Sequence, residues 1–276
     1  MNRKVNWNRV AQVVVVLLVA LVLKQYYSTA SANQLRWVLA PTTMLVSLVS
    51  GESFQFESYA GYITSDHTFV IAAACAGVNF LITAFLMLSL RKLWLDRSAQ
   101  MSWRFIPTAA LVAYLATLIA NAVRITIALQ LLRTPPQIGG FNPSELHRFE
   151  GIFVYFGFLL LLFVVSERGQ PKNTSRLVSL SVFPLLIYYV TALGIPLANS
   201  AYRQKLVGGD FWEHFVFVLL TPLILILPLA VFRYCRSHLL FPREARSPRS
   251  GRERNDLRVL VATSIGRSAG SASFLG

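Results

Sequence analysis

Residues 13–23 read VVVVLLVALVL, an unbroken apolar run inside the longer apolar segment 8–26. A segment of about 20 apolar residues is long enough to cross the hydrocarbon core of a bilayer as a helix. The whole chain agrees with this, because it is 55% hydrophobic and only 14% charged, whereas a soluble domain carries about 25% charged residues. The sequence therefore predicts an all-α polytopic membrane protein.

Five further apolar segments are each long enough to cross: 74–90, 105–132, 148–165, 177–197 and 211–232. A weaker stretch, 35–50, is shorter and is interrupted by Pro41 and two threonines. We therefore predict six transmembrane helices, with 35–50 forming a helix that lies on the outer face of the membrane or dips into it.

Basic residues indicate which segments stay in the cytoplasm. Of the 26 Lys and Arg residues, 19 lie near the N-terminus, in the loops 91–104 and 166–176, and from residue 233 onward. Seven of the 12 acidic residues lie in the other segments. Both termini are then cytoplasmic, so the number of crossings is even, and six satisfies every loop. This pattern accounts for the net charge of +14 without a nucleic-acid partner.

The segment between the first two predicted spans has strand periodicity. Residues 54–59 alternate apolar and polar side chains, Ala60-Gly61 can turn the chain, and 68–71 is β-branched and aromatic. We predict a small β-hairpin on the outer face that leads directly to Cys75.

Residues 1–242 are predicted to form a single integral membrane domain. Residues 243–276 are rich in Arg, Ser and Gly and poor in bulky apolar side chains. Such a segment buries too little surface to fold, so we predict a basic, disordered cytoplasmic tail.

Cys75 opens the second predicted span, within the stretch 72–80 that reads AAACAGVNF. A cysteine at a helix N-terminus faces the positive end of the macrodipole, which favours the thiolate form. Asn79 follows four residues later, so on a helix it shares the face of Cys75, and its side-chain amide can donate a hydrogen bond. The alternative is that Cys75 is a small buried hydrophobe among alanines.

Arg124 and His147 are polar residues at the outer ends of two other spans. Arg124 lies within about two turns of the outer end of its span, and Asn121 precedes it by one turn on the same face. A charge inside a span costs a few kcal/mol and indicates function, although an arginine can also anchor a helix by reaching the surface. His147 opens the next span, where Glu150 is placed to orient it; the alternative is an interfacial histidine without a role.

A thiol, a guanidinium and an imidazole on one side of a membrane are the groups that acyl transfer needs. Here they occur as Cys75-Ala76-Gly77, Asn121-Ala122-Val123-Arg124 and His147, in that order. This order resembles the exosortase and archaeosortase family of membrane cysteine transpeptidases, and the CAGVNF stretch looks most like the exosortase K branch. The resemblance covers roughly residues 35–165, which would be the catalytic part. Ala76 replaces the commoner serine, which removes a hydroxyl but not the nucleophile.

The resemblance implies an enzyme of the bacterial cytoplasmic membrane whose active site faces outward. Its substrates would be exported proteins that end in a short motif, a transmembrane helix and a basic tail, and it would pass the cleaved acyl group to a surface acceptor. Cys75 would attack the peptide, Arg124 would stabilise the oxyanion or bind an acidic group, and His147 would carry the proton. Asn79, Asn121 and Glu150 would support them, with no cofactor or metal.

Two other function classes remain open at this point. A metal-dependent membrane hydrolase would use outer-face side chains, although no two histidines have short ligand spacing; its candidates are His67, His147, His214, Asp66, Glu150, Asp210 and Glu213. A small-anion transporter would use Arg124 as its anion site, although the sequence has no evident repeat symmetry.

Overall fold

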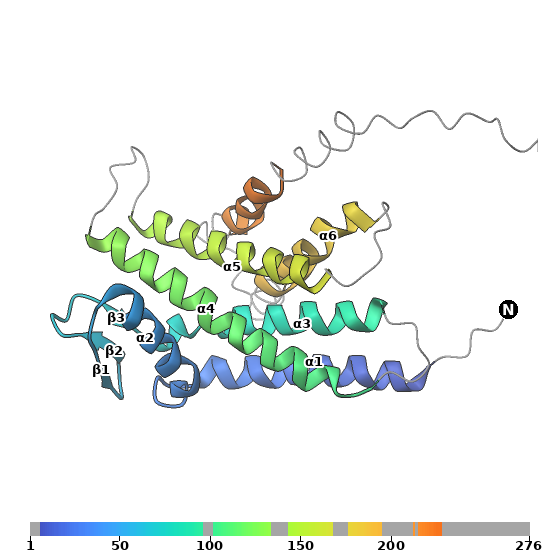
Figure 1. Cartoon of the computed structure of the whole chain (residues 1–276), viewed down its shortest axis with the longest axis horizontal. Helices are drawn as coiled ribbons and strands as arrows, with labels where there is room; N and C mark the ends of the chain where they lie inside the picture. Colours follow the sequence, from blue (N-terminus) through green and yellow to red (C-terminus); the bar gives the residue numbers. More distant parts are fainter. Residues whose placement is uncertain are drawn as a thin grey trace, which may run out of the picture. The chain divides into compact units, whose positions relative to one another are not determined.

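The computed structural model describes residues 6–95, 102–133, 143–167, 176–194, 212 and 215–227. This part of the chain is built almost entirely from helices, which Figure 1 shows in chain order. Their bounds are α1 Trp7–Thr29, α2 Arg36–Ser50, α3 Val78–Leu95, α4 Phe105–Arg133, α5 Pro143–Glu167 and α6 Arg176–Tyr189. The helix α6 continues as the π-helix η2, Val190–Gly194.

The helices have the length and composition of membrane spans. Four are long and apolar enough to cross: Trp7–Thr29, Ala73–Trp94, Phe105–Arg133 and Leu146–Ser166. Two shorter apolar helices, Val182–Gly194 and Phe215–Leu227, lie within the fifth and sixth predicted spans. The all-α polytopic membrane fold predicted from hydropathy is confirmed. Complete crossings by the two shorter helices stay a prediction, and the proposed disordered tail lies outside the described residues.

The helix α3 lies at the centre of the described bundle and packs against α1, α4, α5 and α6. Of its apolar span, 67% is buried, compared with 17% for α1. The helix α4 presents small side chains where it packs against α2, α3 and α5, namely Ala113, Ala116, Thr117, Ala120 and Ala128. Small residues let helix backbones approach closely in a membrane, so α4 can pass between its neighbours.

The stretch 35–50 forms a helix, as predicted, and it continues through Pro41. Proline lacks an N–H, so the carbonyl four residues earlier loses its partner within the helix. That carbonyl belongs to Trp37, and it accepts a hydrogen bond from the Tyr114 hydroxyl of α4 at 2.8 Å. A side chain of a neighbouring helix therefore satisfies the carbonyl that Pro41 leaves without a partner. Whether α2 lies on the outer face stays a prediction.

The predicted hairpin is present, and a third strand extends it. β1 (Phe54–Glu57) and β2 (Gly61–Thr64) are antiparallel, and β3 (Val70–Ile71) pairs antiparallel with β2. Gly61 has φ +119°, and a Cβ there would lie 2.3 Å from the Ile71 carbonyl oxygen, so the turn requires glycine. Directly after β3 the chain enters the 3₁₀-helix η1 (Ala73–Ala76), which carries Cys75.

Candidate active site

Cys75 lies in a tight turn at the beginning of the second span. The turn η1 is closed by a hydrogen bond from the Cys75 N–H to the Ala72 carbonyl, 2.8 Å long. The α-helix proper begins only at Val78, because Gly77 between them has φ +70°. Cys75 is a half-buried free thiol. It therefore stands just before α3, and its expected i, i+4 relationship to Asn79 along one helix is interrupted.

Asn121 connects α4 to this turn. Its side chain is fully buried, and its Nδ2 donates to the backbone carbonyl of Cys75 at 2.6 Å. Its Oδ1 accepts two hydrogen bonds, one from the Tyr155 hydroxyl at 2.8 Å and one from Arg124 Nε at 3.4 Å. The predicted polar pair of Asn121 and Arg124 is thus present, and Asn121 joins it to the cysteine turn.

The guanidinium of Arg124 interacts with the cysteine and with α5. Its charge interacts electrostatically with Cys75 and with Glu150. Its Cζ lies 5.5 Å from the centre of the Tyr155 ring, which places the cation over the face of the ring. Arg124 therefore contacts the Tyr155 ring and Asn121, and its side chain points to the cavity that it lines.

His147 and Glu150 form a pair on the first turns of α5. Nδ1 of His147 lies 3.5 Å from Oε2 of Glu150, as the spacing of three residues predicts. The histidine side chain is 52% exposed, and the glutamate side chain only 6%. The charge of Arg124 acts on both residues. A carboxylate so buried next to an imidazole and a guanidinium is suited to orient the histidine.

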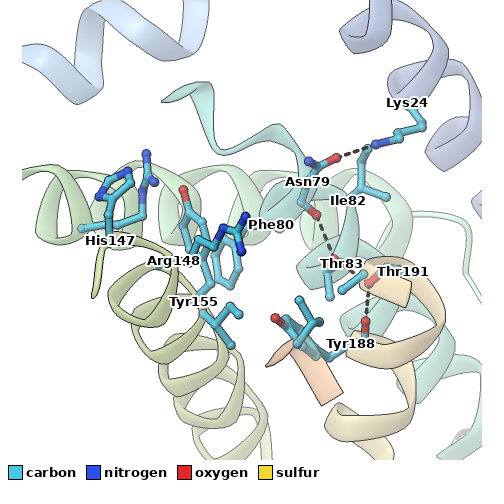
Figure 2. Close-up of a pocket in the computed structure, with 15 residues that line it drawn as sticks. Lys24, Asn79, Phe80, Ile82, Thr83, His147, Arg148, Tyr155, Tyr188 and Thr191 are labelled. Carbon is cyan, nitrogen blue, oxygen red and sulfur yellow. Dashed lines mark hydrogen bonds between the residues drawn. The ribbon is translucent and has the colours of Figure 1, made fainter. Parts of the chain in front are cut away.

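A cavity of about 450 Å³ lies next to these groups (Figure 2). His147 and Arg148 border it on one side, and Lys24 and Asn79 on the other. Its lining also includes residues of α4, α5, α6, η2 and the last apolar helix, namely Arg124, Gly151, Tyr155, Tyr188, Thr191 and Val218. Of the three predicted catalytic residues, Arg124 and His147 line the cavity. Cys75 is not among the lining residues, and Asn121 connects its backbone to Arg124, which is one of them.

The end of α1 contributes two residues that sequence analysis did not single out. Nζ of Lys24 donates to Oδ1 of Asn79 at 2.7 Å and lies 5.8 Å from the centre of the Tyr27 ring. The Tyr27 hydroxyl in turn donates to the carbonyl of Ala74, next to the cysteine, at 3.4 Å. Asn79 therefore acts as an acceptor for a lysine rather than as a donor near Cys75.

Tyr155 is a third residue that sequence analysis missed. A signal for it exists, since it follows His147 by eight residues and Gly151 by four, which places all three on one face of α5. Its ring stacks on Phe80 of α3, with centroids 5.1 Å apart. A tyrosine in an apolar span is too common to be recognised as a site residue without these contacts.

The wall of the cavity opposite α5 includes η2, to which the sequence analysis assigned no functional role. The Thr83 hydroxyl of α3 and the Thr191 hydroxyl of η2 are hydrogen-bonded at 2.9 Å, which ties η2 to the central helix. Among the described residues, no group of three His, Cys, Asp or Glu side chains is placed to hold a metal ion. His214, Asp210 and Glu213 lie outside those residues.

Comparison with known proteins identifies the family of the chain. No curated protein and no solved structure matches the chain. A sequence model described as "Transmembrane exosortase" matches residues 5–165, more than half of the 276 residues. The match includes every element from α1 to α5 that supplies Lys24, Cys75, Arg124 or His147 to the site. The chain therefore belongs to the transmembrane exosortase family.

Proposed function

We propose that this protein is a membrane-embedded cysteine transpeptidase that cleaves a C-terminal sorting signal from exported proteins. One observation carries the proposal: Asn121 is hydrogen-bonded both to the backbone of Cys75 and to Arg124, and Arg124 lines a cavity together with His147. A cation and a proton carrier thus border one space in which a substrate can bind, and the nucleophile is joined to it through Asn121. Family membership supports a sorting transpeptidase in general.

The reaction would proceed in two acyl transfers. The Cys75 thiolate attacks the carbonyl carbon of the scissile peptide, and a C–S bond forms as the carbonyl oxygen takes up negative charge. Arg124 is the group that offsets this charge. When the intermediate collapses, the C–N bond breaks and the leaving amine takes a proton from protonated His147. An amine of a surface acceptor, or water, then attacks the thioester carbonyl and gives a proton to His147. The C–S bond breaks, and Cys75 leaves as the thiolate.

The arrangement around Arg124 gives each neighbour a supporting role. Glu150 holds the imidazole of His147 from a buried position and balances part of the charge of Arg124. Asn121 holds both the Arg124 side chain and the backbone of Cys75. The cavity volume of about 450 Å³ falls in the range of ligand-binding clefts, so it can receive a short stretch of peptide next to the reacting groups.

We also propose that the site faces the outer side of a bacterial cytoplasmic membrane. The C-terminal end of α1, the sheet, the turn η1 and the C-terminal end of α4 meet through contacts such as Lys24 with Asn79 and Arg133 with Glu52. The C-terminal ends of α1 and α4 thus lie on the same side as η1, as six crossings with both termini inside would require. The identity as an exosortase of the K branch stays a prediction from the CAGVNF stretch.

The test is the processing of an exported reporter in intact cells. The reporter is a secreted protein of the same genome that ends in a short motif, a transmembrane helix and basic residues. Cys75→Ala should abolish its cleavage, whereas Cys235→Ala, the matched change at the other cysteine, should not. Normal processing by the Cys75→Ala variant would overturn the proposal. Unchanged processing in Cys75→Ala, together with an anion flux that Arg124→Ala abolishes, would favour the transporter instead.

A further inference from the structure

We propose that Tyr155 is a positioning residue that sets the orientation of the Cys75 turn by way of Asn121. The inference rests on the proposed function, because it assumes that the orientation of the thiol matters for the reaction. In this role Tyr155 neither contacts the substrate nor transfers a proton. The task of its hydroxyl is to hold the amide of Asn121 in one rotamer.

The hydrogen bonds of Asn121 form a chain with one direction. The Tyr155 hydroxyl donates to Oδ1 at 2.8 Å, which leaves Nδ2 to donate to the Cys75 carbonyl at 2.6 Å. If the amide turned over, a donor would face the Tyr155 oxygen and an acceptor would face the Cys75 carbonyl. The second contact would then be repulsive in a fully buried place, where an unpaired polar group costs most. The Cys75 carbonyl, which can only accept, and Arg124 Nε, which can only donate, set which end of Asn121 meets the cysteine. The Tyr155 hydroxyl adds a third hydrogen bond that holds the amide in this orientation.

Gly77 provides the space that this chain needs. A Cβ at Gly77 would lie 3.2 Å from Cγ of Asn121 and 3.2 Å from the hydroxyl oxygen of Tyr155, closer than nine in ten real Cβ contacts. Gly77 also has φ +70°, a conformation that glycine adopts without strain. The glycine of the Cys-Ala-Gly motif thus lets Asn121 and Tyr155 approach the same turn at once.

The ring of Tyr155 packs against the guanidinium of Arg124. The Arg124 cation lies over its face, 5.5 Å from the ring centre, and the ring itself is stacked on Phe80. One side chain therefore contacts Asn121 with its hydroxyl and Arg124 with its ring. These two tasks can be separated, because phenylalanine keeps the ring and removes only the hydroxyl.

The experiment compares Tyr155→Phe with Tyr114→Phe in the full-length membrane protein. Tyr114 is a matched control, because its hydroxyl also donates a single 2.8 Å hydrogen bond, to the backbone of α2. Both variants are made in a Cys235→Ala background, so that Cys75 is the remaining thiol. Two quantities are measured: reporter cleavage as kcat and KM, and the rate of Cys75 alkylation by a small maleimide as a function of pH.

We expect Tyr155→Phe to lower kcat by about three- to tenfold, the usual worth of one hydrogen bond, with KM unchanged. We also expect its alkylation profile to shift along the pH axis, whereas Tyr114→Phe should leave both readouts unchanged. Equal kcat and superimposable alkylation profiles in the two variants would overturn the inference. Alkylation needs no reporter, so this outcome is distinct from a failure of the proposed function.

A double-mutant cycle distinguishes an effect of Tyr155 through Asn121 from a general loss of folding. In an Asn121→Ala background the hydroxyl of Tyr155 has no amide to hold, so Tyr155→Phe should cause no further change in the alkylation profile. An effect of Tyr155→Phe that is as large without Asn121 as with it would contradict the proposed route. Membrane levels of each variant, measured by immunoblot, normalise both readouts.

Discussion

The side-chain amide of Asn121 donates a 2.6 Å hydrogen bond to the backbone carbonyl of Cys75, 46 residues earlier in the chain. This bond joins the middle of the bundle to the turn between the sheet and α3. Because Asn121 also accepts from Arg124, the position of the thiol and the position of the cation depend on one buried side chain. The motif Asn-x-x-Arg therefore has a structural reason in this fold.

Asn121→Asp should inactivate the enzyme although the side chain keeps its size. The change replaces the donor Nδ2 by an oxygen that faces the Cys75 carbonyl, so an attractive contact becomes repulsive. We expect a loss of at least about tenfold in kcat and a loss of stability of about 1–3 kcal/mol. Cleavage of the reporter and thermal unfolding in detergent measure the two effects. Full activity would show that this hydrogen bond does not hold the site together.

Arg124→Lys should not restore the activity that Arg124→Ala loses. Lysine keeps the charge, but it lacks the planar fork that can bind Asn121 and stabilise the oxyanion at once. We expect less than about a tenth of wild-type kcat, measured on the reporter at equal membrane levels of protein. Near-normal kcat in Arg124→Lys would mean that charge alone suffices at this position.

Lys24 should contribute to substrate binding rather than to chemistry. Its ammonium has three donors, one of which goes to Asn79, and it lines the cavity on the side away from His147. We expect Lys24→Met to raise KM by about tenfold with little change in kcat, as for loss of a contact made equally in ground and transition states. Lys24→Arg should retain most of the affinity. The prediction fails if KM is the same in Lys24→Met and the wild type.

Much of the architecture is predictable because hydropathy and helix periodicity act locally. The apolar runs mark the helices, and the spacing of three residues places Asn121 beside Arg124 and His147 beside Glu150. The strand alternation of residues 54–59 likewise indicates β1 and the turn that follows it. Each of these relationships depends on side chains within a few positions of one another.

Other features depend on partners that are distant in the sequence. The helix α2 continues through Pro41 because Tyr114, 77 residues after Trp37, satisfies the carbonyl that the proline leaves without a partner. Lys24 reaches Asn79 across 55 residues, and Tyr155 reaches Asn121 across 34. No periodicity of the sequence reports such contacts. The left-handed Gly77, which separates Cys75 from α3, is similarly set by the approach of Asn121 and Tyr155.

The proposed orientation predicts where tags will be found. A reporter inserted at Ser58, in the turn between β1 and β2, should be accessible from outside the cytoplasmic membrane, because both flanking spans place it there. A reporter at Lys172 should be cytoplasmic. Accessibility to a membrane-impermeant reagent, before and after permeabilisation, measures this. A cytoplasmic position for residue 58 would contradict the arrangement with six crossings.

The most direct measurement of the central claim is to trap the acyl-enzyme. The wild-type protein is incubated with the reporter and quenched in acid, and the mass of the peptide that contains Cys75 is determined. The account predicts an adduct on Cys75 whose mass equals the N-terminal fragment of the reporter and which hydroxylamine removes, as expected of a thioester. Turnover of the reporter with no adduct on Cys75, together with unchanged turnover in Cys75→Ala, would contradict it.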